Sequence, residues 1–330
     1  MRVSCTGLGS LPGPDMATAI GAVLDVFEDF PHLPELPARG PASDMIGRGL
    51  AVVAGLGAQW EAGEWRLAPA AGADQRLARS VLRDDLDRLE EAAHDFQGRF
   101  KVQVCGPWTL AAVVSAGRSA KVLGDGGARR DLAQALAEGV KAHLGEVAKR
   151  LPGAALVLQV DEPALPSVLR GGVPTPGGYF RYGAVDLPEA VGAQAEVAAA
   201  ARAEGAQAAI HCCAPGMPFA ELAAEPSSRS PFEAVSFDLD MLADGDFDAL
   251  ARAAENGAEL WLGVLPTTGG QLPSPDELRA RTLRFLDDIG VRPDSLVLTP
   301  ACGLASLSAG RARQAMTALA KTVAILDDQV

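Results

Sequence analysis

Short apolar runs recur along the 330-residue chain, and most are followed by a stretch with helical spacing. The apolar runs predict strands at residues 3–8, 101–106, 154–161, 207–212, 234–240, 259–265 and 295–300. We expect an eighth, irregular strand in the proline-rich residues 32–39 and an extra hairpin at residues 61–67. Strands that alternate with helices are typical of a parallel sheet, and eight such units favour a sheet that closes into a barrel over an open sheet. The pattern therefore predicts an α/β fold, a single (β/α)8 TIM-type barrel, with residues 1–330 as one domain.

Two of the intervening helices are predicted by the spacing of their apolar residues, and a third by its ends. Ser274-Pro275 with Glu277 three residues after the serine is typical of a helix start, and Gly290 is typical of a helix end. Glycine-rich and proline-rich residues 171–178 and 266–275 are expected to form long loops at the mouth of the barrel. The apolar residues with helical spacing are Leu77, Val81, Leu82, Leu86 and Leu89, and then Leu132, Leu136, Val140 and Leu144.

The net charge narrows the classes of partner. The chain carries 42 acidic and 29 basic residues, a formal charge of −13, and such a surface repels the phosphates of nucleic acids. Hydrophobic residues make up 48%, but no apolar run is long enough to span a bilayer, and the first residues do not have the pattern of a secretory signal. We therefore expect a cytoplasmic protein that acts on small molecules, without membrane or nucleic-acid partners.

Five cysteines and four histidines are candidates for metal chemistry. An odd number of cysteines in a cytoplasmic chain does not indicate a disulfide framework, so clustered Cys and His residues favour a metal site. His94 and His143 lie in helical patterns and are expected at the surface or its boundary. His32 lies in the proline-rich segment, without other candidate ligands beside it.

Reactive groups of TIM-type barrels lie at the carboxyl ends of the strands. Side chains two residues apart on a strand share a face, so His211 and Cys213 can face one ion while Cys212 faces away. With Cys302 they form a soft donor set that suits zinc. A cysteine here could equally be a small buried apolar residue, and Asp161-Glu162-Pro163 could simply start a helix. The polar residues at predicted strand ends are Ser10, Asp161, Glu162, His211, Cys212, Cys213, Asp238, Asp240 and Cys302.

Several short motifs, taken in order, resemble the catalytic half of cobalamin-independent methionine synthase. The similarity runs from the first predicted strand to the last, and the Asp-Glu-Pro-Ala run combined with His-x-Cys and Cys-Gly-Leu is the most specific part. The motifs are Gly9-Ser10, Gly106-Pro107-Trp108-Thr109, residues 159–165 (QVDEPAL), His211-Cys212-Cys213, residues 235–238 (VSFD), residues 262–264 (LGV) and residues 299–304 (TPACGL).

The resemblance implies a barrel that binds zinc and methylates the sulfur of homocysteine from methyltetrahydrofolate. It implies His211, Cys213, Asp238 and Cys302 as zinc ligands, and Asp161 and Ser10 as residues that hold the amino-acid substrate. The full-length enzyme of this family has two barrels, and this chain has the length of the catalytic one only, so it resembles the family's short, single-barrel relatives. Coordination to zinc turns a thiol into a thiolate, which then attacks the methyl group.

The chain also departs from the family pattern. The family has a Gly-Glu pair that grips the substrate amine, and no such pair is found near Arg39-Gly40-Pro41. A histidine of the loop after the seventh strand is missing from residues 265–270. Leu239-Asp240 follow Asp238 where the family has a Ser-Arg segment near the folate, which leaves open a thiol methyltransferase that takes its methyl group from a corrinoid protein. The missing histidine leaves open a second alternative, a non-catalytic barrel that binds zinc or substrate.

The family's acidic zinc ligand is usually Glu, and the matching residue here is Asp238, which is one methylene shorter. We therefore expect a long or absent bond from Asp238 to the metal, and a coordination position open to the substrate thiol. Asp240 is the alternative acidic candidate.

Overall fold

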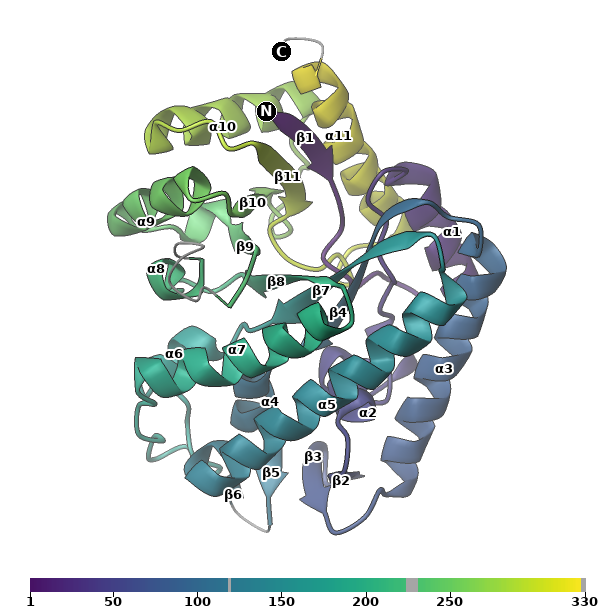
Figure 1. The fold of residues 1–330 in the computed structure, drawn as a ribbon, viewed down its shortest axis with the longest axis vertical. Coiled ribbons are helices and arrows are strands. Elements are labelled where there is room, and N and C mark those ends of the chain that lie inside the picture. The colour runs from purple at the N-terminus through teal and green to yellow at the C-terminus, as the bar shows by residue number, and fades with distance from the viewer. Residues whose placement is uncertain (118–119, 224–230, 328–330) are drawn as a thin grey trace.

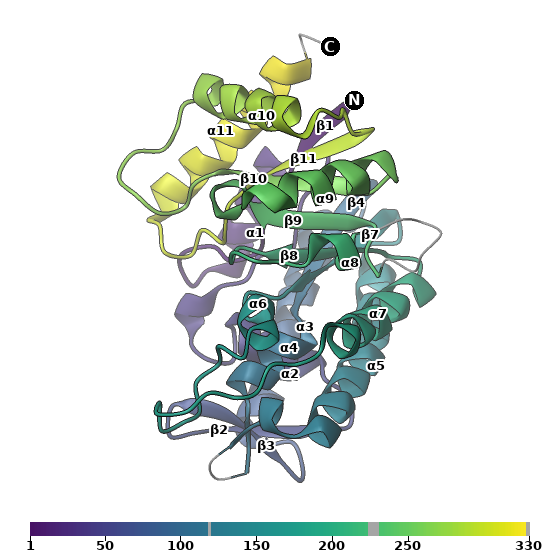
Figure 2. The same ribbon diagram turned by 90° about the vertical axis from the view of Figure 1, so that its left-hand side faces the viewer.

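A curved sheet of seven parallel strands, surrounded by helices, forms the centre of the computed structural model, which describes residues 1–117, 120–223 and 231–327 (Figure 1; Figure 2). Four strands have the predicted bounds and the other three differ at their ends, so the predicted parallel sheet is confirmed. In sheet order the strands are β1 (Arg2–Cys5), β11 (Ser295–Pro300), β10 (Glu259–Leu265), β9 (Ala234–Asp238), β8 (Gln207–Cys212), β7 (Ala154–Asp161) and β4 (Gly98–Cys105).

Residues 31–35 lie between the two edge strands and take the eighth position of the barrel. The Leu33 amide donates to the Lys101 carbonyl in β4 at 2.9 Å, and the Glu35 amide donates to the Gly9 carbonyl beyond β1 at 3.0 Å. The pairing consists of two isolated bridges, because prolines at positions 31 and 34 have no N–H to donate. The irregular strand expected at residues 32–39 is thus present, and it gives way to a 3-10 turn at Pro37–Arg39.

Helices cover the outside of the sheet, as the two ribbon views show (Figure 1; Figure 2). Within the described residues, no helix is both long and apolar enough to cross a membrane. Two more 3-10 turns lie at Val122–Gly124 and Leu239–Met241. The helices are α1 (Met16–Val26), α2 (Met45–Val52), α3 (Ala73–Ala93), α4 (Pro107–Val113), α5 (Gly126–Arg150), α6 (Leu165–Leu169), α7 (Leu187–Ala203), α8 (Phe219–Leu222), α9 (Asp244–Glu255), α10 (Pro275–Ile289) and α11 (Ala309–Asp327).

A small second sheet lies at the lower end of the molecule in Figure 1. Its main part is the antiparallel hairpin of β2 (Gly57–Glu61) and β3 (Glu64–Ala68), and β5 (Ser115–Ala116) and β6 (Ala120–Lys121) extend it. The predicted hairpin is therefore confirmed, although its first strand begins four residues earlier than expected.

Local sequence signals explain most of the helix ends and buried faces. The Ser274 hydroxyl and the Glu277 carboxylate cap each other's backbone N–H groups at the start of α10, and Gly290 ends the helix with a left-handed φ of 66°. The four predicted apolar residues of α5 are all buried. Two predictions were wrong: Leu77 is 55% exposed because it lies on the outer side of α3, and His143 is buried because its side of α5 packs inward.

The interior of the barrel changes character along its axis. One apolar layer, near the start of the strands, combines Phe30 with one residue from each of five strands: Val157, Ala209, Ala234, Trp261 and Val297. Two residues further along the same strands, on the same face, stand Gln159, His211, Ser236, Gly263 and Thr299. An apolar floor therefore closes the barrel below, and polar side chains line it toward the carboxyl ends of the strands.

Candidate metal centre

His211, Cys213 and Cys302 meet at the carboxyl ends of β8 and β11. One ligand atom from each of the three residues lies within 4.8 Å of the others, and the two sulfur atoms are 3.3 Å apart. His211 is buried and the two cysteines are half-buried. The structure therefore brings together the three side chains that the alternation along residues 211–213 and the last strand predict, and their role as ligands stays a prediction.

The neighbours of this His/Cys/Cys group orient it. His211 Nδ1 lies 2.9 Å from the Ser236 hydroxyl on β9, which leaves the other ring nitrogen for a ligand bond. Cys212 is buried, and its thiol contacts the Ala214 carbonyl at 3.7 Å, apart from the group. The alternation of a strand thus separates the two adjacent cysteines.

The two thiols of the group differ in acidity. Hydrogen bonds from the Cys213 thiol and from His211 lower the pKa of Cys302 far below that of an ordinary thiol. The same hydrogen bond to Cys302, together with burial, raises the pKa of Cys213. A thiolate at Cys302, beside Cys213 and the imidazole, favours binding of a cation by the three side chains.

Asp238 lies at the end of β9 and outside the His/Cys/Cys group. Its Oδ1 accepts a hydrogen bond from the Asp240 amide at 2.9 Å, which caps the 3-10 turn that follows. Burial raises its pKa, and the charges of Asp240 and Cys302 add to this. Its carboxylate is not part of the group of ligand atoms that lie within 4.8 Å of one another. Asp240 pairs instead with Arg281 at 2.7 Å on the outer side.

Asp161 and Glu162 are adjacent at the end of β7 and point to different places. Glu162 is fully buried and accepts hydrogen bonds from the Trp108 amide at 2.9 Å and from the Thr109 amide at 2.8 Å. It therefore caps the start of α4, and Gly106 is needed because a Cβ there would collide with its carboxylate. Burial raises the pKa of Glu162 to about 7. The Gly-Pro-Trp-Thr motif thus has a structural role together with Glu162.

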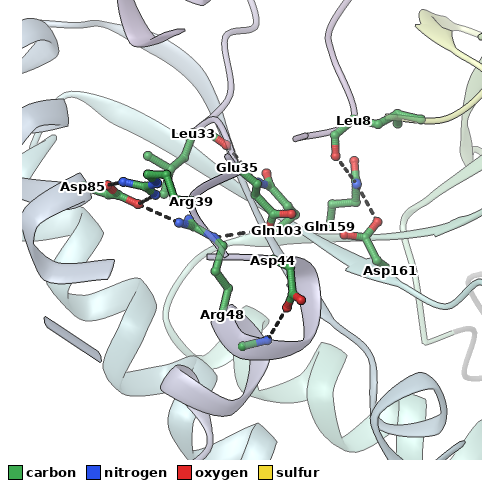
Figure 3. A network of polar contacts seen from close by, with 11 residues as sticks. Leu8, Leu33, Glu35, Arg39, Asp44, Arg48, Asp85, Gln103, Gln159 and Asp161 are labelled. Atoms are coloured by element: carbon green, nitrogen blue, oxygen red, sulfur yellow. Dashed lines mark hydrogen bonds and ion pairs between the residues drawn. The ribbon is translucent and has the colours of Figure 1, made fainter. Parts of the chain in front are cut away.

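Asp161 faces the interior of the barrel. It is 6% exposed, and its Oδ1 accepts a hydrogen bond at 2.7 Å from Gln159, whose amide also donates to the Leu8 carbonyl (Figure 3). Burial and the charge of Glu35 raise the pKa of Asp161, while Lys101 acts in the opposite direction. Asp161 is therefore oriented by Gln159, and its carboxylate can still accept further hydrogen bonds.

Glu35 is the residue that sequence reasoning missed. It ends the irregular eighth strand and is buried, with the Arg48 guanidinium 3.3 Å from its carboxylate. Arg48 also binds Asp85 of α3 at 2.9 Å, and Asp85 takes two hydrogen bonds from Arg39 (Figure 3). A carboxylate thus does stand on the side of the barrel where the Gly-Glu pair was not found. Its position at the end of a strand-like segment is the sequence feature that could have identified Glu35 as a candidate site residue.

Ser10 packs against Gly303, the residue that follows Cys302. The Leu304 amide donates to the Ser10 carbonyl at 2.8 Å, and a Cβ on Gly303 would collide with the Ser10 hydroxyl. Ser10, Asp161 and the His/Cys/Cys group therefore all lie at the carboxyl ends of the strands, from which a substrate could be reached.

Fold and site together define the class of protein, a TIM-type α/β barrel with a His/Cys/Cys group that could hold a metal ion at its mouth. The profile of the family "Cobalamin-independent synthase, Catalytic domain" matches residues 115–325. The chain therefore belongs to this family. The matched region includes Asp161, His211, Cys213, Asp238 and Cys302, whereas Ser10 and Glu35 precede it.

Two solved structures share the fold over most of the chain. A B12-independent methionine synthase from Shewanella sp. W3-18-1, in complex with selenomethionine, has a TM-score of 0.67 and 13% identity, and the match covers 100% of this chain and 99% of that one. A protein from Listeria monocytogenes, assigned as a vitamin-B12-independent methionine synthase, has a TM-score of 0.59 and 13% identity, with 94% and 86% covered. No curated protein matches the sequence. At this identity the two structures support the fold.

Proposed function

We propose that this protein is a zinc-dependent thiol S-methyltransferase. It would methylate homocysteine to methionine, or methylate a related thiol, with methyltetrahydrofolate as the methyl donor. The observation that carries the proposal is the meeting of His211, Cys213 and Cys302 at the mouth of the barrel, with their ligand atoms within 4.8 Å of one another. Membership of the cobalamin-independent synthase catalytic domain family supports the reaction class.

The chemistry of this donor set fits zinc. One imidazole and two sulfur atoms are soft ligands, and three protein ligands with a free position are typical of catalytic zinc sites. His211, Cys213 and Cys302 would hold the ion. Asp238 lies outside their group, which leaves a position for the substrate. When bound, zinc supplies a positive charge that keeps a thiol deprotonated at neutral pH.

Residues of the chain itself would bind and orient the substrate. Asp161 and Glu35 are buried carboxylates on the interior side of the mouth, and both would accept hydrogen bonds from the ammonium group of an amino acid. Ser10 would contact the substrate beside Cys302, because Gly303 lets the two segments approach closely. Binding from two sides would hold the sulfur in line with the methyl carbon, and this positioning itself accelerates transfer.

Two measurements test the proposal. Metal analysis of the purified protein should find about one zinc per chain. The zinc-loaded protein should then transfer a radiolabelled methyl group from methyltetrahydrofolate to homocysteine in a reaction free of cobalamin. Full zinc content without any transfer would contradict the folate donor, and absence of stoichiometric zinc would contradict the metal site.

The first alternative changes the donor to a methylated corrinoid protein. It is favoured by Leu239-Asp240, which follow Asp238 where the family has a Ser-Arg segment near the folate. Transfer that requires methylcobalamin and is not supported by methyltetrahydrofolate would select this alternative. The absence of a proton-transfer histidine from residues 265–270, in the loop after β10, favours a non-catalytic barrel instead. If zinc and homocysteine bind but no donor gives turnover, the second alternative, a non-catalytic binding barrel, is favoured.

A further inference from the structure

Lys101 is a fully buried lysine inside the barrel that the proposed reaction does not use. It lies in β4, its side chain is 0% exposed, and its Nζ has no hydrogen-bond partner within the described part of the chain. Burying an ammonium group without a hydrogen-bond acceptor costs several kcal/mol, so such lysines are rare unless nearby charges compensate for the cost. Lys101 therefore calls for a specific explanation.

The charges that act on Lys101 are the two carboxylates of the proposed substrate site, which stand at the ends of the two neighbours of β4: Asp161 ends β7, and Glu35 ends the irregular strand that pairs with Lys101 through His32. Burial lowers the pKa of Lys101 to about 8, and the charges of Asp161 and then Glu35 raise it again. On the strand-like side lies His32, whose pKa is well below its usual value because it is buried and faces Lys101, so the imidazole is neutral. The ammonium group of Lys101 is thus stabilised by the electrostatic attraction of two acids, without a hydrogen bond to either.

The other cations of the region are already paired. Arg48 spans Glu35 and Asp85, and Arg39 is bound to Asp85 (Figure 3). Asp161 accepts a hydrogen bond from the neutral Gln159 amide, and Lys101 is the cation that acts on it. The charge of Glu35 disfavours the ionised form of Asp161, and the charge of Lys101 favours it.

We infer that Lys101 is a positioning residue for substrate recognition: its charge holds Asp161 and Glu35 close together, with carboxylate oxygens free to accept hydrogen bonds from a substrate ammonium group. A lysine that donated directly to these oxygens would compete with the substrate for them. The inference rests on the proposed function, since it assumes that the ligand is an amino thiol. Lys101 itself does not contact the substrate.

The test compares two ligands on the zinc-loaded protein by isothermal titration. Homocysteine carries the amine, and 4-mercaptobutyrate has the same chain, thiol and carboxylate without it. The preference for homocysteine is the ratio of the two affinities. In Lys101→Met this ratio should fall at least tenfold while the zinc content stays at the wild-type value. Lys101→Arg keeps the charge and should retain the preference. Lys141→Met changes an exposed lysine of α5 and serves as the control.

A second variant covers the case in which Lys101→Met does not fold. Lys101→Gln also removes the charge but keeps a polar side chain that can form hydrogen bonds in the interior, so it should fold and lose the preference for homocysteine as Lys101→Met does. The inference is overturned if Lys101→Met or Lys101→Gln keeps the wild-type preference, or if either variant weakens both ligands equally. A wild-type protein that binds both ligands equally would instead overturn amine recognition in the proposed function, and the role of Lys101 with it.

Discussion

The His/Cys/Cys group and the carboxylate cluster (Glu35, Asp85 and Asp161 with Arg39, Arg48 and Lys101) lie in the same barrel but are built differently. The first comes from the ends of two regular strands, and its three side chains meet with one supporting hydrogen bond from Ser236. The second joins an irregular strand, a 3-10 turn, α2 and α3 through ion pairs, and Lys101 of β4 and Asp161 of β7 add buried charges beside them. A few soft ligands suffice to bind a metal ion, whereas buried charges need compensation from many segments.

This difference implies a division of roles. Changes in the His/Cys/Cys group should remove the metal and leave the fold in place, because the cysteines are half-buried at loop positions. Changes in the carboxylate cluster should affect stability, amine recognition or both, because its charges are buried and shared.

The largest effect is expected for the thiols of the His/Cys/Cys group. Cys213→Ser and Cys302→Ser should each abolish stoichiometric zinc, because a hydroxyl is a far weaker zinc ligand than a thiolate. Cys212→Ser is the matched control and should keep the metal, since its thiol contacts the Ala214 carbonyl. Zinc content of the three purified variants is the measurement. Equal loss in all three would refute the argument from strand alternation.

Arg48→Met should destabilise the fold by about 3–5 kcal/mol, because it leaves Glu35 and Asp85 buried without their shared cation. Chemical denaturation of the variant and the wild type gives the difference. Arg313→Met breaks the exposed pair with Asp25 and should cost less than about 1 kcal/mol. If the two variants lose the same stability, the buried pairs do not support the fold as described.

The buried imidazole of His143, near Arg48, should make the fold sensitive to acid. Burial lowers its pKa from 6.5 to about 4, so the unfolded chain binds more protons and stability falls as the pH drops from about 6.5 to 4. The loss of folding stability from this residue is roughly 3 kcal/mol, because one unit of pKa shift corresponds to about 1.4 kcal/mol. Denaturation of wild type and His143→Gln at several pH values isolates it. An unchanged pH dependence in the variant would refute the assignment.

Asp161→Asn should weaken homocysteine binding by about tenfold or more, because a hydrogen bond to a charged partner is worth about 1.5–3 kcal/mol. The zinc content and the affinity for 4-mercaptobutyrate should hardly change. Calorimetric titration with both ligands measures this. The neighbouring Glu162→Gln should instead lower stability, since Glu162 caps α4. Unfolding caused by Asp161→Asn would show that Asp161 too has a structural role.

The smallest effect is expected at Asp238, whose carboxylate caps a turn beside the His/Cys/Cys group. Asp238→Ala should keep most of the zinc, and Asp238→Glu should bind zinc at least as tightly as the wild type. Competition with a chelator ranks the three proteins. Zinc loss as complete as in Cys302→Ser would make Asp238 a direct ligand. If neither variant changes zinc or thiol binding, Asp240 becomes the acid to examine.

Much of the regular architecture could be predicted from local patterns. The bounds of β7, β8, β10 and β11 follow from apolar runs that end in turn-forming or polar residues. The start of α10 follows from its capping residues, and the common side of His211 and Cys213 follows from the period of two along a strand. These features depend on neighbours within a few residues, so they can be predicted without a structure.

Other features depend on contacts between distant segments, and they can be seen only in the folded chain. Glu35 becomes a partner of Asp161 because residues 31–35 close the barrel in spite of their prolines. The burial of His143 depends on which side of α5 faces α2 and α3, and the isolation of Lys101 depends on the side chains that fill the interior. A sequence pattern records which residues are polar, but the electrostatic cost of burying them, and the charges that compensate for it, arise only when separate strands and helices pack together.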